Sequence, residues 1–578
     1  MKPVRLPASA TIALPRWSIF ALCFLYILPG LIGRDPWKGS DAASFGIMWT
    51  MAHGTWQDWL WPHIVGLTMP EEGPLAFWLG ALCIKIFGPL MGDPMAARIS
   101  TGLAFMLASG SVWYTTYLLG RRTEAQPLKL AFGGQPEPKD FGRTLADGAL
   151  LIFLGCWGLL VPSHQTSASS LHLALFSYSI YLSVRLFDQS KKRYATQLGL
   201  CLGLMILSKG WILPLALFVS LILLSIYRRQ TVWKYLLSLS LPATILVSLI
   251  WILSAQALLP FNSSPIPAWH DWNLKQIATP TWEHIKYFFR YSIWYAWPAW
   301  PFAGWAIYQW RKQERALHIS VPVGILLCVT LLALLNPNHE ETLLLPLLPP
   351  MAILAAFGLP TMKRSAINAV DWFAVMILTG AAGLAWFGAI AMQTGWPTKT
   401  AHKILSWAPG YQAEFNLFLF LIAGAVTIVW FRLVYWRISR QPSVLWRAVV
   451  LSNGGVILCW FLLMTLWLPL INHRVSYAVV TEQLKQNLPT NYRCIDSNLG
   501  PSQRASFAYF GKLHFANFSE QECELLLIQS KRSVEKDSIN AQEKRYPGKW
   551  KIIWQGHRAS DKDEYFSLFE KQNKSKPN

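Results

Sequence analysis

The stretch that decides the fold is WSIFALCFLYILPGLIGRDPWKGSDAASFG, which runs from Trp17 to Gly46. Its first half, up to Ile32, is apolar and close to the roughly 20 residues that a helix needs to cross a bilayer. The second half turns polar at once and carries two carboxylates, Asp35 and Asp41. The apolar run lacks the small-residue cleavage site of a signal peptide, so we expect a retained membrane span followed by an acidic loop.

Composition extends this interpretation to the whole chain. Of its 578 residues, 53% are hydrophobic and only 14% are charged, whereas a soluble protein carries about 25% charged residues. We therefore expect an all-α polytopic membrane protein. The formal net charge of +21 is explained by Lys and Arg that lie in cytoplasmic loops and contact anionic lipid headgroups, so we expect membrane lipids and no nucleic acid as partners.

Basic clusters between the apolar runs predict the topology. If these clusters are cytoplasmic, as the positive-inside rule requires, the spans between them must pair up, and they do. The clusters lie at 121–122, 191–193, 228–229, 311–312, 363–364 and 437–440. About thirteen transmembrane helices result, with a cytoplasmic N-terminus and an external C-terminus. They are expected near 17–33, 97–119, 147–163, 171–187, 195–210, 211–227, 235–256, 291–310, 318–336, 343–360, 370–392, 415–435 and 447–471.

Two apolar regions do not fit a simple span. The run 74–90, PLAFWLGALCIKIFGPL, is short and contains Lys85, so we expect an interfacial or re-entrant helix within the first external loop, 34–96. The region 195–227 contains LSKGWILP, in which Lys209 and Gly210 interrupt two short apolar runs. Broken backbone at membrane depth is tolerated where it lines a cavity or is buried in protein.

Composition changes near residue 473, which divides the chain into a transmembrane domain, 1–472, and a C-terminal domain, 473–578. The second domain has no apolar span, and its pattern predicts a small periplasmic α/β domain. The expected helix is VVTEQLKQNL, and the expected strands are YRCIDSN, RASFAYFGKLHF, CELLLIQS, WKIIWQGHR and EYFSLFEK. Cys494 and Cys523 lie in or beside two of these strands, and their spacing is compatible with a disulfide or with two free thiols.

Asp41 has two interpretations from its position alone. An acid at the external edge of a membrane fold can act as a base or hold a metal ion. In SDAASFGIMW, Ser40 or Asp41 can equally cap the N-terminus of a helix. Asp35 precedes Pro36 and is typical of a turn.

Several stretches in a fixed order resemble a known class of membrane enzymes. After the acid of the first external loop come PEEGPLAFWLGALCIKIFG, AARISTGLAF, GLMILSKGW, YFFRYSIWYAWPAWPFAGWAIYQWRK and LLLPLLPPMAILAAFGL. This series is similar to the GT-C membrane glycosyltransferases, in particular to glycosyltransferase family 39, the protein O-mannosyltransferase group, and to the aminoarabinose-to-lipid-A transferases. The likeness covers most of residues 17–390, and the order and spacing of the stretches carry it.

The resemblance implies a polyprenyl-phosphate sugar as donor and an active-site acid in the first external loop, which matches Asp41. A carboxylate there can take the proton of an acceptor hydroxyl as the hydroxyl attacks the anomeric carbon. The leaving lipid phosphate gains negative charge and needs cations nearby. The candidate cations are Lys85, Arg98, Lys209 and Arg290. The alternatives are that Lys209 extends to a lipid headgroup and that Arg98 and Arg290, which begin spans on the external side, do the same.

The chain departs from the implied pattern at two places. Glu72-Gly73-Pro74 stands where relatives often carry Lys-Pro-Pro, and no second acid follows in SHQTSASSLHLALFS. Glu71 and Glu72 are candidate substrate-binding groups that could compensate for the missing acid; otherwise no metal is used. The metal is therefore unknown, with a divalent ion as one option. The turn NPNHEETLLLP offers Glu340 and Glu341 beside His339, either as acceptor-site groups or as a solvated turn.

Together these observations predict a glycosyltransferase of a bacterial inner membrane that moves a sugar to an envelope lipid, glycan or protein on the periplasmic face. The sequence contains no P-loop, dinucleotide fingerprint or zinc-ligand spacing, so no nucleotide cofactor is expected. Two alternatives belong to other classes. A transporter or flippase of lipid-linked sugars would favour paired broken helices in an internal repeat, and only one break, near Lys209, is visible. A non-catalytic membrane scaffold would not need acids and cations at the external face.

Overall fold

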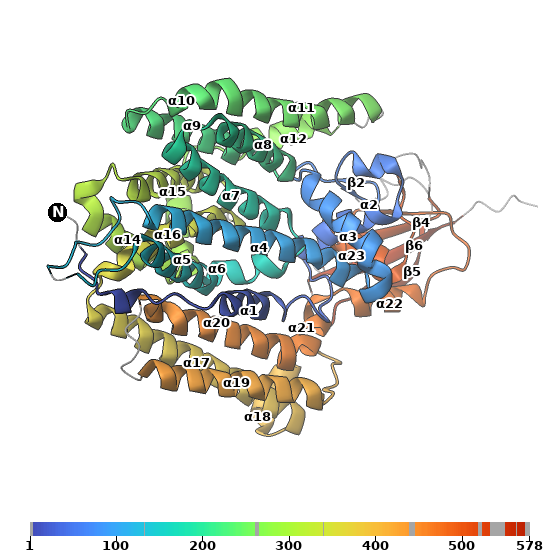
Figure 1. Cartoon of the computed structure of the whole chain (residues 1–578). Coiled ribbons are helices and arrows are strands. Elements are labelled where there is room, and N and C mark those ends of the chain that lie inside the picture. The colour runs from blue at the N-terminus through green and yellow to red at the C-terminus, as the bar shows by residue number, and fades with distance from the viewer. Residues whose placement is uncertain are drawn as a thin grey trace, which may run out of the picture.

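A computed structural model describes residues 4–131, 133–259, 265–338, 340–438, 445–517, 523–531, 550–561 and 563–572. Helices dominate these residues, and the strands form a short hairpin and one four-stranded sheet. Figure 1 shows the long helices as one bundle with the sheet at one end. The expected helical membrane domain with a small C-terminal α/β domain is thus confirmed.

Eight helical segments of the described residues are long and apolar enough to cross a membrane, or nine if the bent pair Pro138–Gly155 and Trp157–His164 forms one span. The two members of that pair meet at 75°. The eight are α4 (Asp93–Gly120), α7 (Ala168–Gln189), α10 to α11 (Val232–Leu258), α15 (Leu317–Leu335), η7 to η8 (Glu341–Thr361), α17 (Arg364–Thr394), α19 (Leu417–Ile438) and α20 to α21 (Val450–Val475).

The remaining four of the thirteen predicted spans are helices that are shorter or divided. Pro29 and Gly30 follow α1 (Arg16–Ile27), and Lys209 and Gly210 separate α8 (Lys192–Ser208) from α9 (Ile212–Tyr227). Pro298 stands at the break between α13 (Trp282–Tyr295) and α14 (Ala299–Trp310). These breaks follow from Pro, which lacks an N–H to donate, and from Gly, which weakens a helix interior.

The run 74–90 forms α3 (Leu75–Met91), which packs on α4 and on α2 (Ser40–His53). Figure 1 places α2 and α3 at the end of the bundle that carries the sheet. That position agrees with a helix of the first external loop, and its depth in the membrane stays a prediction.

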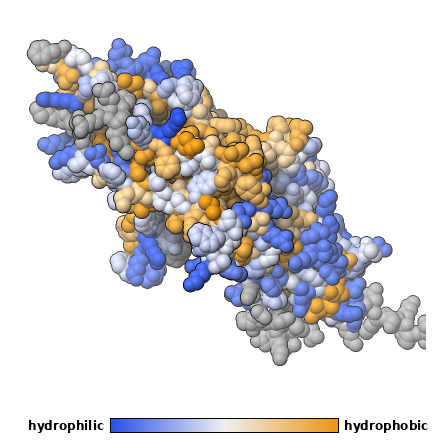
Figure 2. Space-filling view, turned by 90° about the horizontal axis from the view of Figure 1, so that it is seen from below, coloured by the Kyte–Doolittle hydropathy of each residue, from blue (hydrophilic) through white to orange (hydrophobic). Residues whose placement is uncertain are grey.

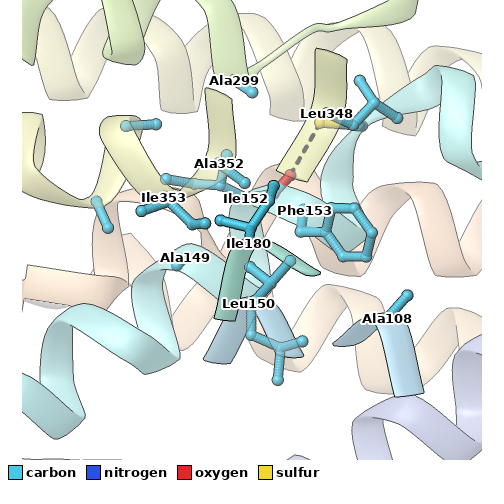
Figure 3. Close-up of a cluster of buried hydrophobic side chains, with 14 of the residues drawn as sticks. Ala108, Ala149, Leu150, Ile152, Phe153, Ile180, Ala299, Leu348, Ala352 and Ile353 are labelled. Carbon is cyan, nitrogen blue, oxygen red and sulfur yellow. Dashed lines mark hydrogen bonds between the residues drawn. The ribbon is translucent and has the colours of Figure 1, made fainter. Parts of the chain in front are cut away.

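The centre of the bundle is an apolar core built around α5 (Pro138–Gly155) and α16 (Leu348–Gly358). Figure 3 shows side chains from α4, α5, α7, α14 and α16 that meet there, among them Phe153, Ile180 and Leu348. Alanines such as Ala149 and Ala352 allow the helices to approach closely. In a membrane, where lipid tails are as apolar as the protein core, such close packing helps to hold helices together. This packing fixes the helix ends that line the site described below.

The outer faces of the bundle are apolar as well. Figure 2 shows a band of hydrophobic side chains across the middle of one face, with hydrophilic side chains toward both ends. On α19, Phe418, Leu421 and Tyr435 are more than half exposed. Exposed apolar side chains of this kind belong in contact with lipid tails.

The C-terminal sheet has the strand order β3-β4-β6-β5. Its strands are β3 (Ile495–Ser497), β4 (Leu525–Ser530), β5 (Trp550–His557) and β6 (Tyr565–Lys571). The first two are parallel, and the other pairs are antiparallel. Four of the five expected strand regions and the expected helix, α22 (Ala478–Lys485), are therefore confirmed.

The fifth expected strand is wrong, because RASFAYFG belongs to helix α23 (Pro501–Gly511). Pro501 at the first helical position and Gly511 at the last are helix-boundary signals. Arg504, Ala505 and Ala508 are buried at helical spacing, although the alternating aromatics imitate a strand.

Two features fasten this domain. Cys494 and Cys523 form a disulfide, with their Cα atoms 5.0 Å apart, so the open question of their pairing is answered in favour of the bond. The Arg504 side chain donates to the carbonyl oxygens of Ile64 and Val65, which belong to the hairpin of the first loop. The sheet is thereby held against the first loop and not only by its own chain connection.

The shorter elements complete the chain. The hairpin consists of β1 (His63–Ile64) and β2 (Leu67–Thr68). The remaining short helices are η1 (Ala8–Thr11), η2 (Trp56–Trp59), α6 (Trp157–Leu160), η3 (Pro162–His164), α12 (Ile266–Leu274), η6 (Arg311–Gln313), α18 (Thr398–Leu405) and η9 (Leu445–Val449).

Candidate active site

A cavity of about 2070 Å³, called the main cavity below, lies between the end of the bundle and the C-terminal sheet. Three regions of the chain line it. The first loop and α2 supply Ser40 and Glu72, the bundle supplies Lys209, and the C-terminal domain supplies Gln529 and Glu564. The wall of the cavity is therefore complete only when the sheet is docked on the bundle.

A second, narrower space adjoins the main cavity and has a volume of about 120 Å³. Its walls come mostly from apolar side chains of α7, α9, α15 and η7, such as Leu173, Leu213 and Leu332. We call it the apolar groove. Lys209 and Glu340 line both spaces, so the charged groups stand where a polar chamber meets an apolar channel.

Lys209 lies at the break between α8 and α9 that the sequence predicted. The chain leaves the helix there, with φ −141° and ψ −58° at Lys209. Its side chain is half-buried, and its Nζ lies 3.5 Å from Ser169 Oγ on α7. The broken backbone thus turns a lysine of an apolar region toward a space that can hold water and an anion.

Glu71 and Glu72 both line the main cavity. Burial raises the pKa of Glu72 to about 7; Lys209 counteracts this rise, while Glu71 and Glu340 add to it. The Oε2 atom of Glu72 is buried and accepts no hydrogen bond from the described residues. A carboxyl group in this state can exist in both protonation forms near neutral pH.

Asp41 lies behind the cavity wall and has no exposed surface. Its Oδ2 accepts hydrogen bonds from Arg34 Nη2 at 3.1 Å and from the Trp37 N–H at 3.1 Å, and Arg98 Nη2 lies 3.5 Å away. Its Oδ1 accepts from the Thr166 N–H at 2.8 Å and from Thr166 Oγ1 at 2.9 Å. Two arginines therefore face this carboxylate, and the structure places it in the protein interior rather than in the cavity wall.

The charge state of Asp41 follows from these partners. Burial alone would raise its pKa, but Arg34, Arg98 and the two backbone N–H groups outweigh burial, so the pKa lies below its ordinary value. The charged form of Asp41 is thereby favoured, and its contacts join the first loop to α4 and to the loop before α7. The helix-cap interpretation receives no support, because the N-cap of α2 is Gly39, which has no side chain. The catalytic role of Asp41 stays a prediction.

The other predicted cations do not line the main cavity or the apolar groove in the described regions of the chain. Arg98 is buried and donates to the carbonyl oxygens of Arg34 and Asp35. Lys85 is exposed on α3, with its Nζ 5.3 Å from the ring centre of Trp59. Arg290 is exposed on α13. Their roles in substrate binding stay predictions, and Lys209 alone of the four has the position that such a role requires.

Acidic side chains and histidines near the cavity are the possible metal ligands of this region. The described residues contain no group of three or more His, Cys, Asp or Glu side chains that could hold a metal ion. Glu340 and Glu341 line the main cavity, which favours their interpretation as site groups over a solvated turn. His339 lies outside the described residues. The ring nitrogens of His164 lie 2.6 and 2.9 Å from the carbonyl oxygens of Leu160 and Tyr26.

Three residues that shape the site are not among the site residues that the pattern of the sequence predicts. Arg34 and Thr166 hold Asp41, and Asn273 on α12 accepts a hydrogen bond from the Trp211 N–H and so holds the helix next to Lys209. The position of Arg34 could have indicated a function, because it ends an apolar run on the expected external side, where the positive-inside rule disfavours Arg. The positions of Thr166 and Asn273 could not, since their roles depend on contacts between distant segments.

Comparisons with known proteins agree with this architecture. No family model matches the chain. It is 27% identical over 463 residues to an undecaprenyl phosphate-alpha-4-amino-4-deoxy-L-arabinose arabinosyl transferase of Pseudomonas paraeruginosa, which covers 76% of this chain and 74% of the relative. A protein of the same name from Pseudomonas aeruginosa is 26% identical over 479 residues, covering 79% and 76% of the two chains.

Solved structures give the same answer for the fold. The structure of ArnT from Cupriavidus metallidurans in the apo state matches with a TM-score of 0.63 at 14% identity, over 96% of both chains. The chain has the GT-C fold. A second structure of that ArnT, bound to undecaprenyl phosphate, matches with the same TM-score over 96% of this chain and 98% of that one. The resemblance to the aminoarabinose transferases that the sequence motifs indicated is confirmed.

Proposed function

We propose that this chain is a membrane glycosyltransferase that moves a sugar from a polyprenyl phosphate to an acceptor in the main cavity. The observation that carries the proposal is the position of Lys209, which lines both a polar chamber and an apolar groove. A lipid phosphate needs this combination of a cation for its head and an apolar path for its chain. The relatives are named as transferases with an undecaprenyl-phosphate donor, which supports this choice of donor.

The chemistry follows from the same geometry. As the bond between the sugar and the phosphate breaks, negative charge grows on the phosphate oxygen, and the Lys209 ammonium stabilises that charge. The low polarity of the groove strengthens the interaction. Asp41 keeps Arg34 and Arg98 in place and so fixes the first loop that forms one wall of the cavity.

The sugar is proposed to carry an amino group. Eight acidic side chains and four lysines line the main cavity, although the chain as a whole has a formal net charge of +21. An acidic wall in a basic protein favours a substrate with positive charge. The relatives are named for 4-amino-4-deoxy-L-arabinose, an amino sugar, and this name agrees with the charge of the wall.

The acceptor is proposed to be a lipid, glycan or protein of the cell envelope that enters beside the C-terminal domain. We place the enzyme in the bacterial inner membrane, with a cytoplasmic N-terminus and with residues 473–578 as a periplasmic domain that follows the transmembrane domain of residues 1–472. The disulfide between Cys494 and Cys523 supports this orientation, because such bonds persist in oxidising compartments.

A reconstituted assay tests the function. The purified protein is placed in lipid nanodiscs with undecaprenyl phosphate that carries radiolabelled 4-amino-4-deoxy-L-arabinose, together with lipid, glycan or protein fractions of a bacterial envelope. We expect label in one acceptor fraction and release of undecaprenyl phosphate. Label that stays on the donor with every fraction, while the same protein moves the donor across vesicle membranes, would instead identify a flippase.

The variant Lys209→Ala tests the site within this assay. A lost charge-assisted contact to phosphate costs about 1.5–3 kcal/mol, so we expect undecaprenyl phosphate to bind roughly 10- to 100-fold more weakly. Lys286→Ala is the matched control, because Lys286 is an exposed lysine on α13 that pairs with Glu283. Equal donor affinity of the two variants would contradict the placement of the phosphate at Lys209.

A further inference from the structure

The loop before α3 is fixed against the break that carries Lys209. The Gly73 N–H donates to the Ser208 carbonyl oxygen at 3.3 Å. A Cβ atom at Gly73 would come within 2.1 Å of the Leu207 carbonyl oxygen, so a side chain at this position would push the two segments apart. This close approach places Glu72 beside Lys209 at the junction of the main cavity and the apolar groove.

Glu72 differs from Asp41 in whether its oxygens are already used. Both oxygens of Asp41 accept hydrogen bonds from inside the protein, and the group has no exposed surface. Glu72 lines the main cavity, and its buried Oε2 has no hydrogen-bond partner among the described residues. A buried oxygen without a donor is costly unless a ligand supplies one. The hydroxyl group of the substrate that receives the sugar can donate that hydrogen bond.

The charged groups that face Glu72 come from three elements. They are Lys209 at the end of α8, Glu71 on the same loop, and Glu340 just before η7. Burial and the two neighbouring carboxylates disfavour the ionised form, whereas Lys209 favours it, and the resulting pKa is about 7. A general base works best when its pKa lies near the working pH.

We propose that Glu72 is the catalytic base that takes the proton of the acceptor hydroxyl, a role that rests on the transferase function proposed above. In this step the O–H bond of the acceptor breaks and its proton moves to the Glu72 carboxylate, which lines the main cavity. The acceptor oxygen forms a bond to the anomeric carbon of the sugar. The bond from that carbon to the phosphate oxygen breaks, and the phosphate leaves with the electron pair beside Lys209. No oxidant, reductant or further reactant is needed.

The variant Glu72→Gln tests this role, because it keeps the shape of the side chain but cannot take a proton. We expect transfer to fall roughly 100-fold or more, while undecaprenyl phosphate binds as well as to the unchanged protein. The matched control is Glu283→Gln, an exposed glutamate that lies in neither cavity wall. Glu72→Asp should keep part of the rate, since it keeps a carboxylate at a shorter reach.

The pH profile separates a base from a merely structural residue. A base acts in its deprotonated form, so transfer by the unchanged protein should rise as the pH passes through about 7 and then level off. The Glu72→Gln variant should lack this rise. If it transfers at the normal rate, keeps the rise, or loses rate only because it no longer binds undecaprenyl phosphate, the assignment of the base is overturned. If the unchanged protein transfers no sugar, the proposed function itself fails.

Discussion

At the scale of single residues, two carboxylates of the first loop, Asp41 and Glu72, differ in what surrounds them. Asp41 is fully buried between two guanidinium groups, whereas Glu72 lines the cavity and has a buried Oε2 without a hydrogen-bond partner among the described residues. The sequence pattern indicated Asp41 because the family that this chain resembles has an active-site acid after the first span. It could not show whether that acid reaches the cavity, because this depends on Arg34 and Thr166 closing around it.

Replacement of Asp41 by Asn should therefore lower stability as well as activity. The amide –NH₂ group would replace an oxygen that accepts from Arg34, Trp37 and Arg98, and it would leave two buried cations without their anion. Breaking a buried charge pair costs about 3–5 kcal/mol. Thermal unfolding of purified Asp41→Asn and Asp35→Asn variants measures the difference. Equal melting temperatures of the two variants would show that Asp41 does not stabilise the fold through its contacts with Arg34 and Arg98.

The ion pairs of Asp41 with Arg34 and Arg98 also make the stability of the fold depend on pH. The pKa of Asp41 lies below its ordinary value in the folded protein, so its contribution is present above the ordinary value of about 4. It is lost as the pH falls through the lower, folded value. The difference in stability between the unchanged protein and Asp41→Asn should shrink only in strong acid. If this difference shrank between pH 6 and 8, a group other than Asp41 would be titrating.

At the scale of elements, the contact between α2 and α23 docks the sheet and completes the cavity. A Cβ atom at Gly46 on α2 would come within 2.3 Å of Ala505 Cβ on α23. Ser502 at the start of α23 also accepts a hydrogen bond from the Gly39 N–H at 2.9 Å. The absence of a side chain at Gly46 thus sets the distance between the bundle and the C-terminal domain.

Replacement of Gly46 by Ala should loosen this contact. Overpacking of a tight interface costs about 1–3 kcal/mol, although Ala alone favours a helix over Gly by about 1 kcal/mol. Gly110→Ala on α4 is the matched control, because a Cβ atom there has no neighbour within 4 Å. We expect faster proteolysis of the C-terminal domain in Gly46→Ala only. Equal cleavage of both variants would contradict a close docking at Gly46.

The sequence predicted elements well where one local signal dominates. The break at Lys209 and Gly210 was visible as an interruption of an apolar run. Strand β4, Leu525–Ser530, was visible because it begins with four consecutive apolar residues. Helix α23 was mistaken for a strand because alternating aromatics suggested a period of two, while Pro501 and Gly511 gave the correct boundary signals. The docking of α23 on α2 depends on contacts between residues more than 400 positions apart, which no local pattern reveals.

At the scale of the whole molecule, the main cavity exists because three distant regions of the chain meet. The first loop, the break in the bundle and the C-terminal domain each supply a portion of its wall. If sugar transfer takes place in the main cavity, as proposed, it occurs on the side of the membrane that holds the C-terminal domain. Sequence predicted a bundle with the sheet at one end, and Figure 1 shows this arrangement.

Cysteine labelling tests which side this is. Lys551 on β5 and Lys129 in the loop after α4 are both exposed, and they lie in the predicted periplasmic and cytoplasmic regions. The excess of Lys and Arg in the loops near 121–122 favours the cytoplasm for the second position. In intact cells whose outer membrane is permeabilised, a maleimide that cannot cross the inner membrane should modify Lys551→Cys and spare Lys129→Cys until lysis. The unchanged protein, with its own free cysteines, supplies the background. Modification of Lys129→Cys before lysis, with Lys551→Cys protected, would invert the topology and place sugar transfer on the cytoplasmic face.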